Sequence, residues 1–223
     1  MSQSKLGILM LDTIFHRPIG DIGNPETFTF PVEFEVVEKA TIERVMKKSD
    51  SSLIEPFIQA AKRLERNGVK AITTSCGFLA LFQQDIQRQL KIPFFSSSLM
   101  QIPMVHHLTG GTVGVLTARK ESLTHKHLQG VNAQHTPIVM AGMDHMPAFT
   151  KAIVDETHAL DMEAVSLEMK QVTFSLLEDR PDIRAIVLEC TNMPPYRDAL
   201  REATHLPVFD ITTLANYVYR SFD

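Results

Sequence analysis

The chain contains two cysteines, Cys76 and Cys190, which occupy equivalent places in an internal repeat. Residues 69–76 have the sequence Val-Lys-Ala-Ile-Thr-Thr-Ser-Cys and residues 183–190 have the sequence Ile-Arg-Ala-Ile-Val-Leu-Glu-Cys, an offset of 114. The same offset aligns Ile-Pro-Phe-Phe at 92–95 with Leu-Pro-Val-Phe at 206–209. Each copy is typical of a buried strand that ends in a cysteine and is followed by a helix and another strand. Because ligands of open α/β sheets bind beyond the carboxyl ends of strands, the repeat predicts two thiols that face one cleft.

A thiol in such a place is suited to proton transfer. In the first turn of a helix it feels the positive end of the helix dipole, which lowers its pKa and favours the thiolate. Free backbone N–H groups and short polar side chains beside the cysteines are expected to bind a substrate carboxylate; they belong to Thr74, Ser75, Gly77, Phe78, Thr191 and Asn192. This pocket predicts removal of a proton from the carbon next to a carboxylate. The alternative is that both cysteines only pack in the core as small apolar residues.

Composition narrows the class of protein. With 223 residues, of which 44% are hydrophobic, the chain can form one large core or two lobes of about 100 residues each. The net charge of −4 and the lack of a dense Lys/Arg stripe argue against nucleic acid or an anionic membrane as the partner, so we expect a small molecule. The amino-terminal residues do not resemble a signal peptide and no apolar run reaches membrane-spanning length, so a cytoplasmic protein with reduced cysteines is predicted. No dinucleotide, phosphate-loop or zinc motif is found, so we expect no cofactor and no metal.

Strands alternate with helices along the chain. The apolar run at 6–11 and the run at 112–117 share a pattern with glycine in second or third place, and shorter strands are predicted at 32–36 and 138–140. Helical spacing of apolar residues predicts helices over 53–64, 78–90, 119–129, 161–179, 194–203 and 212–222. Residues 13–31 are rich in proline and glycine and predict a long loop. The predicted fold class is therefore α/β, with two pseudo-symmetric lobes that each hold a parallel sheet flanked by helices.

Four motifs, taken in order, resemble the aspartate/glutamate racemase superfamily, which also holds hydantoin racemases, arylmalonate decarboxylases and maleate isomerases. They are Asp-Thr at 12–13, Thr-Ser-Cys-Gly at 74–77, Val-Gly-Val-Leu-Thr at 113–117 and Glu-Cys-Thr-Asn at 189–192. The resemblance covers most of the chain. It implies a cofactor-independent two-base reaction in a cleft between the lobes, in which Cys76 and Cys190 exchange the roles of acid and base. It also implies that Asp12 contacts the substrate amino group or supports a base, and that Thr117 offers its hydroxyl to the carboxylate.

The same resemblance implies how the chain is divided. The last helix of the family packs back onto the first lobe, which gives lobe 1 as residues 1–98 plus 211–223 and lobe 2 as residues 99–210. Members of the family often form dimers, so a homodimer is left open.

Some residues depart from the glutamate racemase pattern. Asn192 stands where those enzymes commonly have histidine, and Gly77-Phe78 replaces their Asn-Thr, so glutamate is disfavoured as the substrate. Both cysteines are kept, which argues against a decarboxylase because that reaction needs one proton donor. Three hypotheses follow: a racemase or epimerase of an amino acid, related carboxylate or hydantoin; another isomerase or lyase of the superfamily, similar to maleate isomerase or arylmalonate decarboxylase; and a non-catalytic protein that binds a small acid or senses redox state.

Two loops are further candidates for substrate recognition. Arg17, Asp21 and Asn24 lie beyond the first predicted strand, where one of them is a candidate to recognise the distal group of the substrate. Asp144 and His145 follow the strand predicted at 138–140 and are weighed between a place facing the cleft and a plain turn. The substrate and its stereochemistry cannot be read from these residues.

Overall fold

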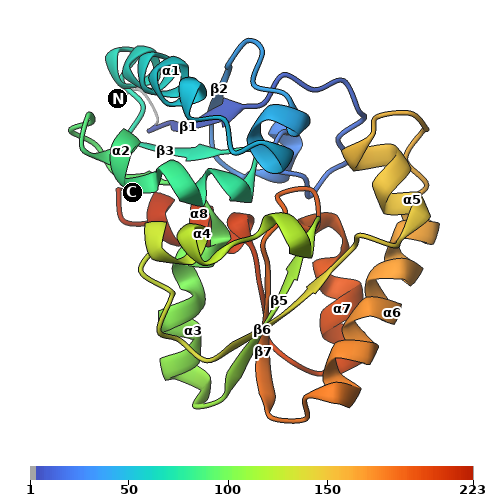
Figure 1. Ribbon diagram of the computed structural model, residues 1–223. Coiled ribbons are helices and arrows are strands. Elements are labelled where there is room, and N and C mark those ends of the chain that lie inside the picture. Colours follow the sequence, from blue (N-terminus) through green and yellow to red (C-terminus); the bar gives the residue numbers. More distant parts are fainter. Residues whose placement is uncertain (1–3, 223) are drawn as a thin grey trace.

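Two four-stranded parallel sheets form the framework of the computed structural model, which describes residues 4–222 (Figure 1). The first sheet has the order β2 (Val32–Val36), β1 (Leu6–Met10), β3 (Ala71–Thr74), β4 (Phe94–Phe95). The second has the order β6 (Ile138–Gly142), β5 (Thr112–Thr117), β7 (Ile183–Leu188), β8 (Val208–Phe209). The two orders correspond strand for strand, so the predicted α/β fold with two similar parallel sheets is confirmed.

A glycine at the same point of each sheet lets a helix approach the central strand closely. A Cβ on Gly7 in β1 would lie 3.0 Å from Leu64, and one on Gly114 in β5 would lie 3.3 Å from Leu176. Leu64 belongs to α1 (Ile54–Arg66) and Leu176 to α6 (Met162–Asp179). The apolar-glycine pattern seen in the sequence therefore reflects equivalent packing of a helix on each sheet.

The remaining helices are short, and several differ from their predicted bounds. They are α2 (Gln83–Gln87), α3 (Ile102–Thr109), α4 (His125–Gly130), α5 (Pro147–Phe149), α7 (Arg197–Thr204) and α8 (Ile211–Tyr219). Turns of 3₁₀-helix cover Pro25–Thr27, Ser51–Leu53, Gly77–Phe82, Ser98–Gln101, Lys120–Ser122 and Pro194–Tyr196, and π-helical turns cover Glu43–Lys47 and Thr150–Val154. The single helix predicted over 78–90 is wrong, because a 3₁₀-helix and the short α2 divide that segment. Neither π-helical turn was predicted.

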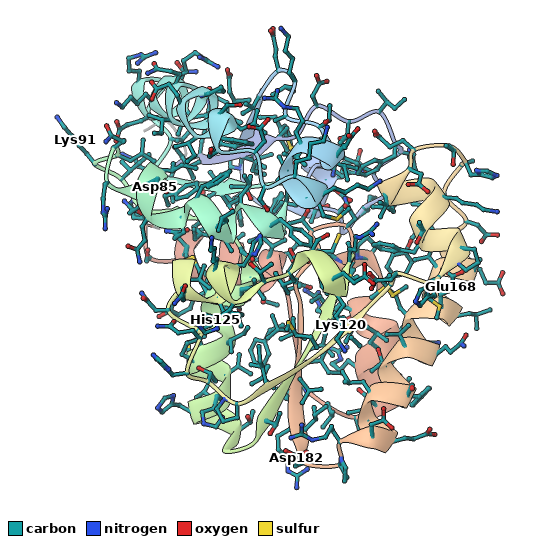
Figure 2. The ribbon with its side chains drawn as sticks, in the orientation of Figure 1. Asp85, Lys91, Lys120, His125, Glu168 and Asp182 are labelled. Carbon is teal, nitrogen blue, oxygen red and sulfur yellow. The ribbon has the colours of Figure 1, made fainter. Side chains whose placement is uncertain are left out.

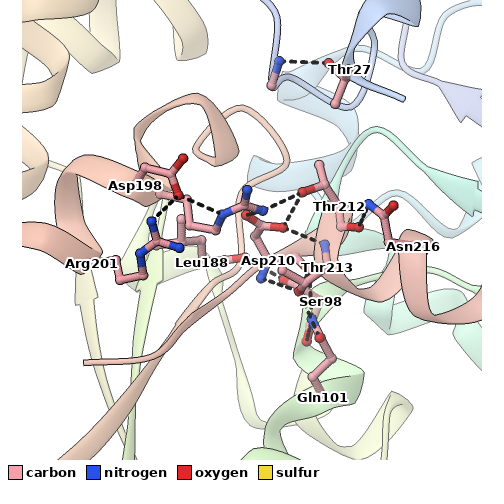
Figure 3. Close-up of polar contacts among 12 residues, drawn as sticks. Thr27, Ser98, Gln101, Leu188, Asp198, Arg201, Asp210, Thr212, Thr213 and Asn216 are labelled. Atoms are coloured by element: carbon pink, nitrogen blue, oxygen red, sulfur yellow. Dashed lines mark hydrogen bonds and ion pairs between the residues drawn. The ribbon is translucent and has the colours of Figure 1, made fainter. Parts of the chain in front are cut away.

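Helix α8 packs against the first sheet. Leu214 and Tyr219 share a buried cluster with Leu6 and Ile8 of β1. Asp210 caps the helix by accepting the Thr213 N–H at 2.8 Å, and its carbonyl accepts the Gln101 amide at 2.8 Å (Figure 3). These contacts fix the last helix to the segment that leads into α3. The assignment of residues 1–98 plus 211–223 to one lobe and 99–210 to the other stays a prediction.

A charged side chain of α6 supports a segment near the thiols. Glu168 on α6 lies beside α5 and accepts the backbone N–H groups of Ala148 and Phe149, at 2.8 and 2.9 Å (Figure 2). This fixes the start of α5 and therefore the π-helical turn Thr150–Val154 that follows it. Within residues 4–222, no helix has the length and apolar character needed to cross a membrane.

Candidate active site

Cys76 and Cys190 line one cavity at the carboxyl ends of β3 and β7. Its walls come from segments that follow β1, β3, β5 and β7 and from the two π-helical regions: Leu11, Thr13, Phe15, Arg17, Ile42, Met46, Ser75, Cys76, Gly77, Phe78, Ala118, Ile153, Val154, Glu189, Cys190, Thr191 and Asn192. The cavity volume is about 30 Å³, which is enough for water but not for an organic acid. A larger and more open surface groove beside α8, of about 920 Å³, contains neither cysteine.

Cys76 follows β3 and precedes the 3₁₀-helix Gly77–Phe82. Its backbone is extended, with φ of −154°, and its N–H donates to the Thr74 hydroxyl at 3.3 Å. Burial raises the pKa of the thiol to about 12 and the nearby Glu189 also raises it, whereas the backbone N–H groups of Phe78 and Leu79 and the charge of Arg17 lower it. The expected lowering of the thiol pKa by a helix dipole is therefore wrong, because one short 3₁₀-helix does not offset burial beside a carboxylate.

Cys190 lies in a more enclosed environment. Its thiol donates to Asn192 Oδ1 at 3.4 Å, and Asn192 Nδ2 donates to Asp21 Oδ2 at 2.6 Å. Burial raises the pKa of this thiol well above its usual range, and Glu189, Cys76 and Asp21 add to the effect. The nearest helical turn, Pro194–Tyr196, begins beyond Met193, so no helix starts at Cys190. The proton of this thiol is held toward Asn192.

An ion pair in the loop after β1 supports the hydrogen bonds that run from Cys190 through Asn192 to Asp21. Arg17 Nη1 lies 2.8 Å from Asp21 Oδ1, and both side chains are largely buried. Arg17 also donates to the Thr13 hydroxyl at 2.9 Å and lies 4.4 Å from the centre of the Phe15 ring. Of the loop residues considered from the sequence, Arg17 lines the cavity, Asp21 supports Asn192, and Asn24 caps the short helix Pro25–Thr27.

Hydrogen bonds of Ser75 and Thr191 connect the turns that carry Cys76 and Cys190 to each other and to the first sheet. The Thr191 hydroxyl donates to the Ser75 carbonyl at 2.6 Å, and the Ser75 hydroxyl accepts the Leu11 N–H at 2.8 Å. Both residues line the cavity as predicted, but their hydroxyls already have backbone partners. The first of these bonds joins the two cysteine turns, and the second joins the Cys76 turn to the residue that follows β1.

Three residues proposed from the sequence do not line the cavity. Asp12 is exposed, and its carboxylate accepts the Lys39 N–H at 3.0 Å. Thr74 is buried and donates to the Ser96 carbonyl at 2.7 Å, while the Thr117 hydroxyl donates to Glu189 Oε2 at 2.7 Å. Asp12 and Thr74 therefore lie behind the cavity wall, and Thr117 reaches the cavity only through Glu189, which does line it.

Asp144 and His145 also lie away from the thiols. They line a separate surface groove at the edge of β6, and Asp144 Oδ2 accepts the Lys120 N–H at 3.0 Å. Both residues lie in a turn, which was one of the two interpretations considered.

The apolar part of the cavity comes largely from Phe78, which the sequence singled out, and from four residues that it did not. Phe78 lines it and packs edge to face on His127, with ring centres 5.5 Å apart. Ile42, Met46, Ile153 and Val154 come from the two π-helical regions. A π-helical turn has no 3.6-residue periodicity, so these residues carried no pattern that would assign them to the site. One end of the cavity is therefore suited to an apolar group.

Glu189 is the most unusual residue of the site. It is fully buried, its Oε2 accepts the Thr117 hydroxyl, and burial raises its carboxyl pKa to about 7. The sequence contained a signal for it, because a carboxylate directly after the buried strand β7 is seldom found without a purpose.

Within residues 4–222, no cluster of three or more His, Cys, Asp or Glu side chains is arranged to hold a metal ion.

A family model and several known proteins match this chain over most of its length. A family model described as Asp/Glu/Hydantoin racemase matches residues 31–216. A dimethylsulfoniopropionate lyase of Durusdinium sp. clade D is 31% identical over all of this chain and 76% of its own length. Dimethylsulfoniopropionate lyase 7 of Emiliania huxleyi is 33% identical over 95% of this chain and 65% of its own length, so the chain spans only part of these relatives.

Solved structures share the fold at low sequence identity. A putative Asp/Glu racemase from Yersinia pestis superposes with a TM-score of 0.64 and 14% identity, covering 98% of both chains. Glutamate racemase from Francisella tularensis, solved with D-glutamate, gives a TM-score of 0.59 and 18% identity over 100% of this chain and 81% of the other.

Proposed function

The chain belongs to the Asp/Glu/hydantoin racemase family, and we propose that within this family it is a lyase that cleaves dimethylsulfoniopropionate into dimethyl sulfide and acrylate. The similarity to the Durusdinium lyase, 31% identity over the whole chain, is the observation that carries this proposal. Two thiols on one small cavity support it, since the substrate has an acidic proton next to a carboxylate. The proposal keeps the small carboxylate substrate expected from the sequence and replaces racemisation by elimination.

The reaction needs one base. A thiolate removes a proton from C2, the electron pair of that C–H bond forms the C2–C3 double bond, and the C3–S bond breaks with its electrons going to sulfur. Dimethyl sulfide leaves as a neutral molecule and acrylate remains. Because the leaving group carries a positive charge before cleavage, it needs no proton from an acid, and the second thiol has no proton to deliver.

The surroundings of the two thiols support Cys76 as the base. Cys76 is partly exposed, two backbone N–H groups and Arg17 favour its thiolate, and it borders the cavity. Cys190 is buried, and three acidic groups disfavour its ionisation. A sulfur that donates to Asn192 is a neutral thiol, so Cys190 acts as a fixed wall of the site that positions the substrate.

The two ends of the substrate match two parts of the cavity. Arg17 is the cation on its wall, and its guanidinium is suited to the substrate carboxylate once that carboxylate competes with Thr13 for its N–H groups. The sulfonium carries two methyl groups, for which the apolar side chains of Met46 and Ile153 provide contact and the Phe78 ring provides a π face. Substrate entry requires the loop over 13–31 to move, because the cavity of about 30 Å³ is too small for the substrate.

Racemisation is the second candidate, because two thiols on one cavity also suit transfer of a proton between two faces of one carbon. It requires either thiol to donate, whereas the proton of Cys190 is directed to Asn192. The two candidates differ in their products, which makes them simple to separate.

The test is proton NMR of the purified protein in deuterated buffer with dimethylsulfoniopropionate and, in parallel, L-aspartate, L-glutamate and a 5-substituted hydantoin. We expect vinyl signals of acrylate and the methyl signal of dimethyl sulfide, and no exchange of the α-protons of the amino acids. The variant with both Cys76→Ser and Cys190→Ser serves as the control. Exchange of an amino acid or hydantoin without acrylate formation would establish racemisation instead.

A further inference from the structure

Glu189 has one carboxylate oxygen without a hydrogen-bond partner. The residue lies between β7 and Cys190, and its side chain is fully buried. Thr117 donates to Oε2 at 2.7 Å, and the backbone N–H of Ala118 also lowers the pKa of the carboxyl, whereas Oε1 is shielded from solvent and has no hydrogen-bond partner among the described residues. An unpaired buried carboxylate oxygen is costly, so it is kept where it exchanges a proton or meets a ligand.

The unpaired oxygen lies at the turn that carries Cys76. A Cβ on Gly77 would overlap both Glu189 Oε1 and the Glu189 carbonyl, so the carboxylate rests directly on the backbone of the residue that follows Cys76. Glu189, Gly77 and both cysteines line the same cavity. The glycine at 77 therefore makes room for the carboxylate beside the turn that follows Cys76.

Both thiols need a proton acceptor before either can act as a base. Burial raises their pKa values, so both are protonated near neutral pH. The other charged groups facing the site are occupied, because Arg17 pairs with Asp21, and Asp21 also accepts from Asn192. Burial also raises the pKa of the Tyr196 phenol, so it is neutral too. Glu189 is thus the carboxylate in the cavity wall with a free oxygen, and its pKa of about 7 leaves it partly ionised at neutral pH.

We infer that Glu189 Oε1 accepts the thiol proton of Cys76 and thereby generates the thiolate that removes the C2 proton of the substrate. The inference rests on the proposed lyase function. The proton passes from Cys76 Sγ through a water molecule, for which the cavity of about 30 Å³ has room, to Glu189, which becomes a neutral carboxylic acid. The Cys76 thiolate then takes the C2 proton, dimethyl sulfide and acrylate leave, and Cys76 is again a thiol. Glu189 releases its proton to solvent, so each turnover delivers one proton to water.

Loss of the Glu189 carboxylate changes the turnover rate in opposite directions depending on whether Glu189 is a proton acceptor or only a nearby charge. By charge alone, ionised Glu189 makes Cys76 harder to ionise. Removing the charge with Glu189→Gln would then leave the thiol more acidic and the enzyme as active as before or more so. As the proton acceptor, Glu189 is required, and the same substitution slows turnover although the thiol becomes more reactive.

The experiment measures two properties of Glu189→Gln: the rate of dimethyl sulfide release against pH, and the alkylation rate of Cys76 by iodoacetamide, assigned by peptide mass spectrometry. We expect release to fall by about 100-fold or more, within the range of general acid–base contributions, while Cys76 is alkylated at pH 8 at the wild-type rate or faster. Glu189→Asp keeps the carboxylate and is expected to retain part of the activity. Full activity of Glu189→Gln would overturn the inference and leave the lyase proposal intact.

Thr117→Val is the matched variant that keeps the carboxylate. The Thr117 hydroxyl lowers the pKa of Glu189, so its loss raises that pKa and moves the acid limb of the rate profile to higher pH. A purely structural Glu189 would lower the rate at all pH values without moving this limb. An unmoved limb therefore contradicts the inference.

Thiol alkylation also tests the inference if the wild type releases no dimethyl sulfide. If Cys76 and Glu189 titrate as a coupled pair, the pair loses its first proton near pH 7. Above this pH the remaining proton is shared between the two groups, so the small fraction of Cys76 that is thiolate stays constant. Wild-type alkylation should rise to an inflection near pH 7 and level off, whereas Glu189→Gln should rise steadily through this range. A wild type without the inflection overturns the inference, while an inactive wild type with the inflection overturns only the lyase assignment.

Discussion

The Cys76 and Cys190 half-sites have the same position in two equivalent sheets but different chemistry. Each thiol follows the third strand of its sheet order, and the 114-residue offset pairs Ser75 with Glu189 and Phe78 with Asn192. These replacements leave Cys76 partly exposed beside an apolar ring and enclose Cys190 among acidic groups. The repeat therefore supplies the scaffold, and the residues directly beside each cysteine set the surroundings of its thiol.

The largest expected effect comes from removing the base of the more accessible half-site. Cys76→Ser keeps the shape of the side chain but replaces the thiol by a hydroxyl that is far harder to ionise. We expect dimethyl sulfide release to fall by about 10³-fold, because general-base catalysis contributes 10²- to 10⁴-fold. Gas chromatography of dimethyl sulfide at saturating substrate measures this loss. A variant with more than a tenth of the wild-type rate would break the assignment of Cys76.

The second prediction isolates the carboxylate that distinguishes the two half-sites. The pKa of Glu189 is raised from 4.5 to about 7 in the folded protein, so the folded state keeps a proton that the unfolded chain loses between these pH values. The contribution of the Glu189 carboxyl group to the free energy of unfolding is therefore fully present below pH 4.5 and is lost as the pH rises through 7. This loss is about 3 kcal/mol at most. Urea unfolding of the wild type and Glu189→Gln should show this loss in the wild type only. Parallel curves would show that Glu189 titrates alike in both states.

Only part of this site could be predicted from the sequence. The cysteine pair and the parallel sheets followed from the internal repeat and from buried apolar strands, which are local patterns. The raised thiol pKa values did not follow, because they depend on burial in the folded protein and on the charge of Glu189. Thr117 illustrates the same limit, since its hydroxyl was expected to bind substrate and instead binds a carboxylate 72 positions further along the chain.

A smaller effect is expected from the loop that joins the half-sites. Arg17→Gln removes the cation proposed to bind the substrate carboxylate and also the partner of Asp21. A charge-assisted hydrogen bond contributes about 1.5 to 3 kcal/mol, so KM should rise by about tenfold or more, with a smaller change in kcat. Steady-state kinetics measures both values. If kcat falls while KM is unchanged, Arg17 acts on the chemical step rather than on binding.

The smallest effect concerns closure of the cavity. The Ile14 N–H donates to Glu156 Oε1 at 2.7 Å, and Lys47 lies 3.9 Å from Asp155, so two exposed contacts link the two sides of the cavity. Exposed pairs contribute up to about 1 kcal/mol, so Glu156→Ala should change kcat/KM by less than about fivefold while increasing hydrogen exchange at residues 13–16. Glu156→Gln keeps an acceptor and is the matched control. Unchanged exchange in Glu156→Ala would show that this contact does not hold the loop.

The most direct test of unequal half-sites compares Cys76→Ser with Cys190→Ser under identical conditions in deuterated buffer, with acrylate formation from dimethylsulfoniopropionate followed by NMR. The account predicts that Cys190→Ser retains measurable elimination, at least about tenfold faster than Cys76→Ser, because elimination needs one base and a neutral leaving group. Equal loss in both variants would contradict it and would mean that the two thiols act as a pair.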